Sequence, residues 1–427
     1  MKNYLDKLKS NRFISNFIKL FSATLFSQVI IIAISPLLTR LYSPEDFGMY
    51  SLYIAVVTLI IVYSTWRYEI AIASTKDLKV SEEIFKLVIV ISIISSIVVA
   101  ITILIGREEL NNLFGLSKSN LILFFIPITV MGMAVMNAFN YYYNRQQEFS
   151  HLSKSKVIQS VTTSFTSVGF GFVGLNSIGM IIANVFGIFS VVLYNTLFKN
   201  SKKLFFIREY NFSKLKEIAI KYKEYPLYNT HSAFIDVIAI QAPVIIFTRF
   251  FSEVITGLYA LTVRVITLPL SIISVAVSQV YLSEMVEKEN RGEDLYPSIK
   301  KTFRLLSIIG ILPTIIIILF APTLFNIFFG EKWLEAGKLA QIMAMAYYAK
   351  FIISPLSMIF IVKNAIKLLS KIQFLRAILT ISILIISVLI FNDIYITLFI
   401  FMLYEVLVYI CLGYFIFKIS KERSEIS

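Results

Sequence analysis

Residues 84–106 read IFKLVIVISIISSIVVAITILIG, and they decide the fold because Lys86 is their only charged residue. A bilayer core about 30 Å thick is crossed by about 20 apolar residues in a helix. This stretch is long enough, and its apolar residues are continuous instead of alternating as in barrel strands. Similar stretches recur, and we mark twelve candidate spans: 14–38, 47–74, 84–106, 120–143, 156–175, 178–198, 227–250, 254–282, 303–329, 336–361, 372–391 and 394–417. The sequence therefore predicts an all-α membrane protein.

The composition agrees with a membrane protein and excludes several kinds of site. Hydrophobic residues make up 57% of the 427 residues and charged residues 15%, against roughly one quarter charged in soluble domains. Cys411 is the single cysteine, so the chain forms no internal disulfide. Together with His151 and His231 it makes no plausible zinc site, and we expect neither a metal nor a cofactor. The N-terminal apolar run is too long for a signal peptide, so we expect it to be retained.

Lysine and arginine are distributed unevenly between the two sides of the predicted topology. If the N-terminus is cytoplasmic, 30 of these residues fall in cytoplasmic segments and 6 on the opposite side, as the positive-inside rule requires. One missed or invented helix would invert every later loop and destroy the asymmetry. The pattern predicts twelve spans with both termini cytoplasmic. The net charge of +14 is then a topology signal and an attraction to membrane lipids, and indicates no nucleic-acid partner.

A short motif occurs twice in the chain, 209 residues apart. TRLYS at 39–43 is followed by GMYSL at 48–52, and TRFFS at 248–252 is followed by GLYAL at 257–261. Both copies join the first and second helix of a half, so the sequence predicts two pseudo-symmetric six-helix lobes around a central cavity. We place the N-terminal lobe at 1–198, a cytoplasmic connector at 199–225 and the C-terminal lobe at 226–427.

The connector contains a helical apolar stripe, formed by Phe212, Leu215, Ile218, Ala219 and Tyr222, with lysines around it. This pattern predicts an amphipathic helix at the membrane interface, joining the two lobes. A solvated linker is the alternative.

Charged residues inside the predicted spans are the candidate functional residues. A charge near the bilayer centre costs about 2.5–3.5 kcal/mol on insertion scales, so such a residue faces a cavity or a partner. We predict that a cationic cavity binds an anionic substrate through Arg67, Arg264 and Lys350, with Arg40 and Arg249 of the repeated turns. Glu69, Asp236 and Glu405 would be counter-charges or proton carriers. The alternative is that these residues form structural pairs between helices.

Arg67 and Glu69 lie two positions apart in one predicted helix. Residues with this spacing point to different faces, so we expect these two side chains not to pair.

Motifs of enzymes are missing or misleading. The string at 169–174 matches G-x-G-x-x-G, but it lies in an apolar span without a βαβ unit, so we assign its glycines to helix packing. The chain contains no P-loop or nucleophile motif, and we predict that it is not an enzyme. Membrane glycan polymerases and ligases usually have a large periplasmic loop, and every predicted periplasmic loop here is short.

Several strings resemble the Wzx-type oligosaccharide flippases of the multidrug/oligosaccharidyl-lipid/polysaccharide exporter superfamily. They are PLLTRLYSPEDFGMY at 36–50, WRYEIAI at 66–72, KEYP at 223–226, and GLYAL at 257–261 followed by Arg264, Leu268-Pro269 and Ser278-Gln279-Val280. The resemblance covers nearly the whole chain. Lipid II flippases of this superfamily usually have fourteen helices. Its drug exporters have twelve, but the Arg-Tyr-Glu string favours the polysaccharide branch.

The resemblance implies a flippase that moves undecaprenyl-diphosphate-linked oligosaccharide repeat units by alternating access, for O-antigen or capsule synthesis. It implies lipid-linked oligosaccharide and membrane lipids as partners, with a polysaccharide polymerase and a chain-length regulator as candidate protein partners. Ion coupling or removal of the product would give direction. An ion-coupled drug exporter of the same fold is the second hypothesis, and a membrane glycan polymerase or ligase is the third.

Overall fold

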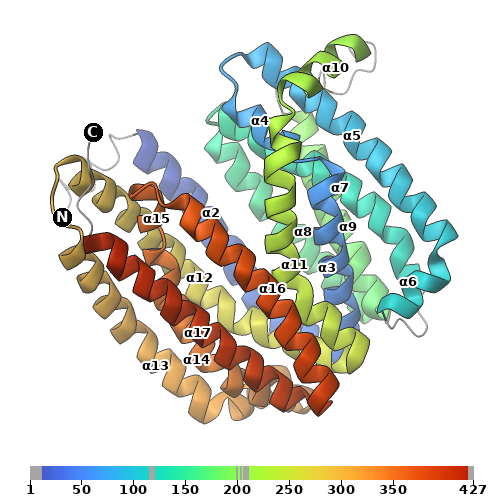
Figure 1. Ribbon diagram of the computed structural model, residues 1–427. Coiled ribbons are helices and arrows are strands. Elements are labelled where there is room, and N and C mark those ends of the chain that lie inside the picture. Colours follow the sequence, from blue (N-terminus) through green and yellow to red (C-terminus); the bar gives the residue numbers. More distant parts are fainter. Residues whose placement is uncertain (1–11, 115–120, 199–200, 202–203, 205–210, 422–427) are drawn as a thin grey trace. The chain divides into compact units, whose positions relative to one another are not determined.

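The computed structural model describes residues 12–114, 121–198, 201, 204 and 211–421. Within these residues every regular element is helical, and twelve helices have 21 or more residues (Figure 1). Each of the twelve coincides with one predicted span, which confirms the all-α membrane fold. The chain is a multi-pass membrane protein.

The chain divides into two compact units, Met1–Gln241 and Ala242–Ser427. The division falls inside the helix α11 (Thr230–Phe250), which follows the connector expected at 199–225 in the sequence. The N-terminal unit contains α2 (Arg12–Leu41), α3 (Pro44–Ser64), α4 (Tyr68–Ser74), α5 (Leu78–Ile105), α6 (Arg107–Phe114), α7 (Leu121–Arg145), α8 (Phe149–Phe172), α9 (Asn176–Leu197), α10 (Phe212–Lys221), the π-helical turn η3 (Tyr225–Asn229) and the start of α11.

The helix α7 is central to the N-terminal unit, where it packs against α3, α4, α5, α8 and α9. Its rings stack with those of α5: the centroids of Phe85 and Phe139 are 4.9 Å apart. The two-helix turn between α8 and α9 ends the G-x-G-x-x-G string at Gly174, whose φ of +77° favours glycine. Gly171 packs closely on α2, because a Cβ there would lie 3.0 Å from Leu41. By contrast, Gly169 faces open space, so helix packing explains only part of the string.

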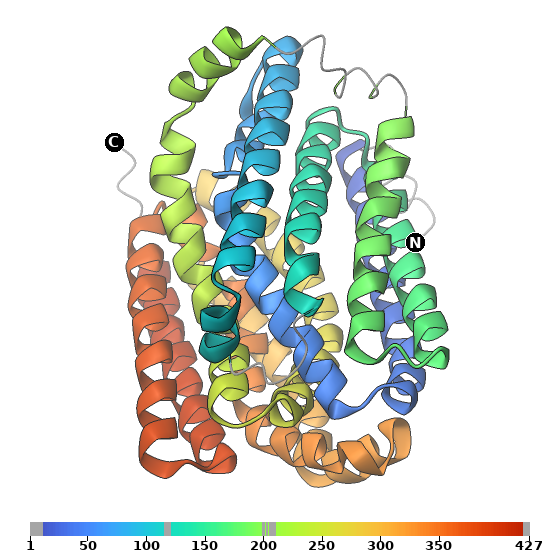
Figure 2. The same ribbon diagram turned by 90° about the vertical axis from the view of Figure 1, so that its right-hand side faces the viewer.

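The connector helix α10 forms within the stripe predicted at 212–222. Leu215 and Ile218 are buried in the core of the N-terminal unit, and Ala219 and Tyr222 pack against that core. Lys214 Nζ lies 3.4 Å from Glu83 Oε1 on α5. The apolar stripe, except for the exposed Phe212, is thus covered by protein. The helix α10 lies at the end of α5 opposite to α6 (Figures 1 and 2).

The C-terminal unit contains the end of α11, α12 (Glu253–Asn290), α13 (Tyr296–Phe329), the 3₁₀ turn η4 (Glu331–Trp333), α14 (Leu334–Leu356), α15 (Ile359–Val362), α16 (Ile366–Phe391) and α17 (Ile394–Lys421). α14 is its central helix and packs against α12, α13 and α17. Trp333, just before α14, is fully buried. The helix α14 therefore carries its side chains into the interior of this unit.

The repeated turns have the same cap in both units. Ser43 Oγ accepts a hydrogen bond from the Asp46 amide at the start of α3, and Ser252 Oγ accepts one from the Ile255 amide at the start of α12. Each hydroxyl satisfies an amide that has no partner within its helix. In the first copy Asp46 also accepts from the Ser177 amide, at 2.7 Å, which ties the turn to α9. The sequence repeat is therefore a repeated helix–cap–helix structure.

Eleven helices of the described residues satisfy the length and hydropathy expected of a membrane span. The predicted span 156–175 is the exception, and it corresponds to α8. α8 is 24 residues long, which is sufficient to cross a bilayer, but it is rich in serine and threonine and carries Lys154 and Lys156. Its buried face is mainly serine, and it packs against α2 and α9.

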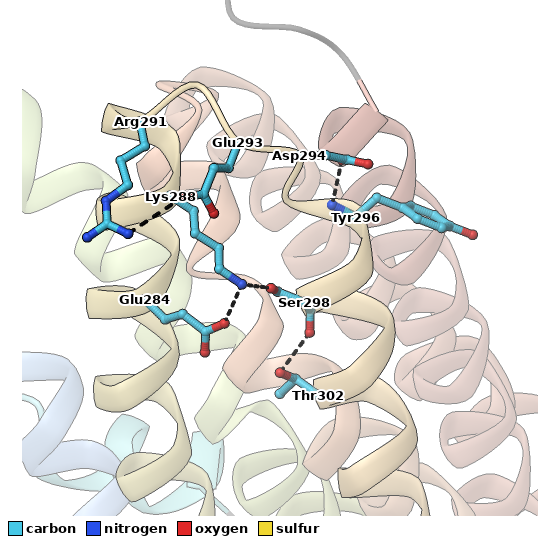
Figure 3. A network of polar contacts seen from close by, with 8 residues as sticks. All are labelled: Glu284, Lys288, Arg291, Glu293, Asp294, Tyr296, Ser298 and Thr302. Carbon is cyan, nitrogen blue, oxygen red and sulfur yellow. Dashed lines mark hydrogen bonds and ion pairs between the residues drawn. The ribbon is translucent and has the colours of Figure 1, made fainter.

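The longest helix, α12, extends beyond its candidate span, which ends at Ser278, and meets the start of α13 in a polar network (Figure 3). Lys288 Nζ lies 2.8 Å from Glu284 Oε1 and donates to the Ser298 hydroxyl. The hydrogen bond from Lys288 lowers the pKa of Glu284. Lys363, before α16, pairs with Glu289 at 2.9 Å. Because the Glu284 and Lys288 side chains are partly solvated, this network positions helix ends and adds little stability.

Candidate functional site

A break in the helix separates α3 from α4 and shapes the first candidate site. Trp66 and Arg67 both have left-handed backbone conformations, with φ of 50° and 58°. Each such residue costs roughly 1–2 kcal/mol when it is not glycine. The Tyr68 amide donates to the Thr65 carbonyl at 3.2 Å, so a tight turn replaces the helical hydrogen bonds. The predicted single span 47–74 is therefore two helices.

The break brings Arg67 and Glu69 together, and the prediction that they would not pair is wrong. Arg67 Nη1 lies 3.8 Å from Glu69 Oε1. The prediction assumed helical spacing, whereas the left-handed turn rotates Arg67 back toward the first turn of α4. No glycine or proline marks residues 65–67, so the sequence carries no ordinary signal for this break.

Glu69 is a buried acid, and one of its carboxylate oxygens has no hydrogen-bond partner. Its side chain is 3% exposed, whereas that of Arg67 is 33% exposed. Glu69 Oε2 and Arg67 Nε are both buried and have no hydrogen-bond partner. Glu69 lies outside the candidate spans, and burial raises the pKa of its carboxyl despite the nearby guanidinium of Arg67. A carboxyl of this kind holds its proton to a higher pH than an exposed glutamate does.

An aromatic group lies next to the break. The ring of Trp66 is 43% exposed and packs edge-on against Tyr63, with centroids 5.9 Å apart. Tyr63 in turn contacts Phe234 and His231 of α11, at 5.0 Å and 6.2 Å between centroids. His231 thus packs against Tyr63, and the rings hold the turn against α11.

The second candidate site lies in the C-terminal unit and contains an arginine that the sequence prediction missed. Arg376 of α16 donates to Glu405 of α17 from Nη2 to Oε2 at 2.7 Å and from Nε to Oε1 at 3.3 Å. The guanidinium also lies over the Tyr409 ring, 5.4 Å from its centroid. Because Arg376 makes two hydrogen bonds to one carboxylate, this is the most specific of the ion pairs in which a predicted site residue takes part.

Arg376 lies near the cytoplasmic end of the predicted span 372–391, and the sequence prediction counts it among the 30 cytoplasmic lysines and arginines. The signal that could have found it is the hairpin geometry of α16 and α17, which turn at Asn392-Asp393. Arg376 is 17 residues before Asp393 and Tyr409 is 16 residues after it, so the two lie at equal depth in an antiparallel pair.

Lys350 of α14 is near this pair in electrostatic terms, since the charges of Arg376 and Glu405 both act on its ammonium. The Lys350 side chain is exposed, and its ammonium lies 5.5 Å from the centroid of the Tyr347 ring. The structure thus brings together Lys350 and Glu405 of the predicted set and adds Arg376.

Four residues of the predicted set remain: Arg40, Arg249, Arg264 and Asp236. Arg40 and Arg249 are exposed at equivalent places in the two repeated turns, and Arg249 lies over the Phe250 ring at 5.8 Å. Arg264 is half-buried in α12, and Asp236 is exposed in α11.

The described residues contain no group of three or more histidine, cysteine, aspartate or glutamate side chains that could hold a metal ion. His151 is buried, its Nε2 lies 2.7 Å from Asn195 Oδ1, and its ring stacks on Phe198. These contacts are those of a packed core histidine.

The family model described as polysaccharide biosynthesis protein matches residues 37–338. This range includes both repeated turns and the break at Trp66-Arg67, and it ends within α14 before Lys350. A search of curated protein sequences finds no match.

Solved structures of transporters have the same fold. The lipid II flippase MurJ in an inward closed conformation has a TM-score of 0.69 at 17% identity, over 94% of this chain and 90% of that chain. An inward-facing multidrug resistance MATE family transporter of the MOP superfamily has a TM-score of 0.66 at 14% identity, over 95% and 96%. The Vibrio cholerae MATE transporter VcmN in the bent form has a TM-score of 0.54 at 12% identity, over 97% and 98%.

Proposed function

The chain belongs to the polysaccharide biosynthesis protein family, and from this premise we propose that it moves a diphosphate-linked oligosaccharide lipid across the membrane. The proposed substrate is an undecaprenyl-diphosphate-linked repeat unit for O-antigen or capsule. Its prenyl tail would remain in the bilayer, while its charged and sugar groups would pass along polar side chains. The proposal places the protein in the bacterial inner membrane with both termini cytoplasmic.

The observation that carries this proposal is a set of cations in helices of a transporter fold. Lys350 is exposed on the most central helix of its unit, and Arg67 and Arg376 are about one-third exposed while each contacts a buried carboxylate. Removing a diphosphate from water is unfavourable unless cations replace its hydration. Arginine also offers paired donors that fit phosphate oxygens. Arg264, Arg40 and Arg249 complete the proposed set.

A fold shared with a lipid II flippase supports the same proposal. That protein is named for a lipid-linked saccharide, and its similarity to this chain extends over both units. Directionality would come from an ion carried by Glu69, Asp236 or Glu405, or from consumption of the product by a polymerase.

The test is complementation of a strain in which the gene is deleted. We expect the deletion to abolish surface polysaccharide and to cause lipid-linked repeat units to accumulate on the cytoplasmic face. Lys350→Ala and Arg264→Ala should each impair export at normal protein abundance. Lys338→Ala, which removes an exposed cation paired with Glu335 at 2.7 Å, is the matched control and should export normally.

A second candidate is an ion-coupled exporter of small molecules, because two of the similar structures are MATE transporters. Buried carboxylates such as Glu69 are compatible with ion coupling. This candidate predicts that the deletion leaves surface polysaccharide intact and sensitises cells to cationic drugs. If lipid-linked repeat units fail to accumulate in the deletion strain, the flippase proposal is rejected in favour of the exporter.

A further inference from the structure

In the cluster of Lys350, Arg376 and Glu405, the two cationic side chains are more exposed than the carboxylate. The side chain of Arg376 is 32% exposed, whereas that of Glu405 is 10% exposed. Lys350 is exposed and, among the described residues, is assigned no ion pair. The two positive groups are therefore more exposed than the carboxylate. A site that merely neutralised a buried arginine would not need the accessible lysine.

Building on the proposed function, we infer that Glu405 occupies the place of a substrate phosphate at Arg376, so that carboxylate and phosphate compete for one guanidinium. Glu405 binds the edge formed by Nε and Nη2. That edge binds carboxylates and phosphates with the same two parallel hydrogen bonds. An incoming phosphate reaches its best geometry only when the carboxylate leaves.

The charges of the cluster fit a diphosphate. With Glu405 ionised and in place, Lys350, Arg376 and Glu405 sum to one positive charge. With the carboxylate displaced, Lys350 and Arg376 offer two positive charges. A diphosphate esterified at both ends carries about two negative charges. Two cations on α14 and α16, both of which pack against α17, can therefore neutralise the headgroup, and Glu405 returns to Arg376 after release.

Aromatic side chains keep the guanidinium in position when Glu405 leaves. Tyr409 provides a ring face 5.4 Å from the guanidinium carbon, and this contact does not depend on the carboxylate. The Tyr404 hydroxyl donates to the Arg376 carbonyl at 2.9 Å and holds the backbone of α16 to α17. The Tyr347 ring lies against the ammonium of Lys350, as the Tyr409 ring does against the guanidinium of Arg376. The other titratable group near Glu405 is Tyr259 of α12.

The competing explanation is a structural ion pair between α16 and α17. A buried pair stabilises a fold weakly, but removal of one partner leaves an uncompensated charge. Both explanations predict that Glu405→Ala is harmful. They differ in what they predict for anion affinity.

The experiment measures binding of inorganic pyrophosphate to the full chain in lipid nanodiscs by isothermal titration calorimetry. We expect Glu405→Gln to bind pyrophosphate about tenfold more tightly than the unchanged protein, because a competing anion is gone. Arg376→Gln should bind pyrophosphate more weakly than the unchanged protein. The double variant, Arg376→Gln with Glu405→Gln, should lose the affinity that Glu405→Gln alone gains. Glu335→Gln removes a carboxylate from an exposed pair on the same helix as Lys350 and should leave the affinity unchanged.

A charge swap, Arg376→Glu with Glu405→Arg, keeps the inference testable if Glu405→Gln folds poorly. We expect the swapped protein to fold, because the pair is restored, and to lose pyrophosphate affinity. The inference is overturned if Glu405→Gln binds no more tightly or if the swap keeps full affinity. If no form binds pyrophosphate while the gene still complements export, this site falls and the flippase proposal stands. If export is independent of the gene, the proposed function itself falls.

Discussion

Substitution of Gly337 by alanine provides the sharpest test of how the C-terminal unit is packed. Gly337 lies in the first turn of α14, opposite Pro322 of α13. A Cβ at this position would lie 2.4 Å from Pro322 Cα and 2.7 Å from the Ala321 carbonyl oxygen. Both are backbone atoms, so no side chain can rotate away. The two helices must separate to admit the methyl group, as at other close helix contacts made by small residues.

We expect Gly337→Ala to destabilise the protein by about 3 kcal/mol, at the upper end of the cost of overpacking. For a unit of this size that corresponds to a fall in melting temperature of roughly 6–12 °C. The assay is thermal unfolding of the purified protein in detergent, followed by size-exclusion chromatography of the remaining folded fraction.

Gly169→Ala is the matched control, since a Cβ there would have no atom within 4 Å. Gly169 lies within α8, and alanine is favoured over glycine inside a helix by roughly 0.5–1 kcal/mol. This variant should be as stable as the unchanged protein or slightly more stable. A Gly337→Ala melting temperature within about 2 °C of the Gly169→Ala value would refute the close approach of α13 and α14.

Three further predictions concern stability. Ser43→Ala and Ser252→Ala should each cost about 1 kcal/mol in thermal unfolding, with the larger loss at Ser43 because Asp46 completes a capping box only there; equal losses would contradict the role of that box. Leu215→Ala should cost about 2–4 kcal/mol and expose α10 to limited proteolysis, whereas Phe212→Ala, at a site 71% exposed, should do neither; an intact α10 in Leu215→Ala would count against its docking. Because the pKa of Glu69 is raised by burial, the folded state holds this proton to higher pH than the unfolded state, so stability should fall as pH rises above about 4.5. Glu69→Gln should remove that part of the pH dependence. An identical stability profile against pH for Glu69→Gln and the unchanged protein would show that Glu69 is not its source.

The fold was largely predictable because the helices respond to a signal that is local in sequence. Continuous apolar runs located all twelve long helices, and the repeated Thr-Arg-x-x-Ser strings marked two turns whose serines are caps. Even the polar helix α8 was found, since its length and position fit the alternation of spans. The connector stripe also predicted α10, but hydropathy could not distinguish a membrane surface from the protein core that covers Leu215.

The site was less predictable because it depends on backbone geometry and on pairing between distant helices. Trp66 and Arg67 adopt left-handed conformations that neither residue type favours, so helical spacing gave the wrong relation between Arg67 and Glu69. Arg376 was hidden by its place near a span boundary, where a long side chain can reach either a headgroup or a neighbouring helix. Only the packing of α16 on α17 shows that it reaches Glu405.

The two tryptophans of the chain offer a consequence for spectroscopy. Trp66 is 43% exposed at the break in the N-terminal unit, and Trp333 is fully buried in the C-terminal unit. Their emission should therefore differ in colour, with a red-shifted contribution from Trp66 and a blue-shifted one from Trp333. Replacing either ring by phenylalanine would leave a natural fluorophore in a single unit, so the response of each unit to a ligand could be followed without an attached dye.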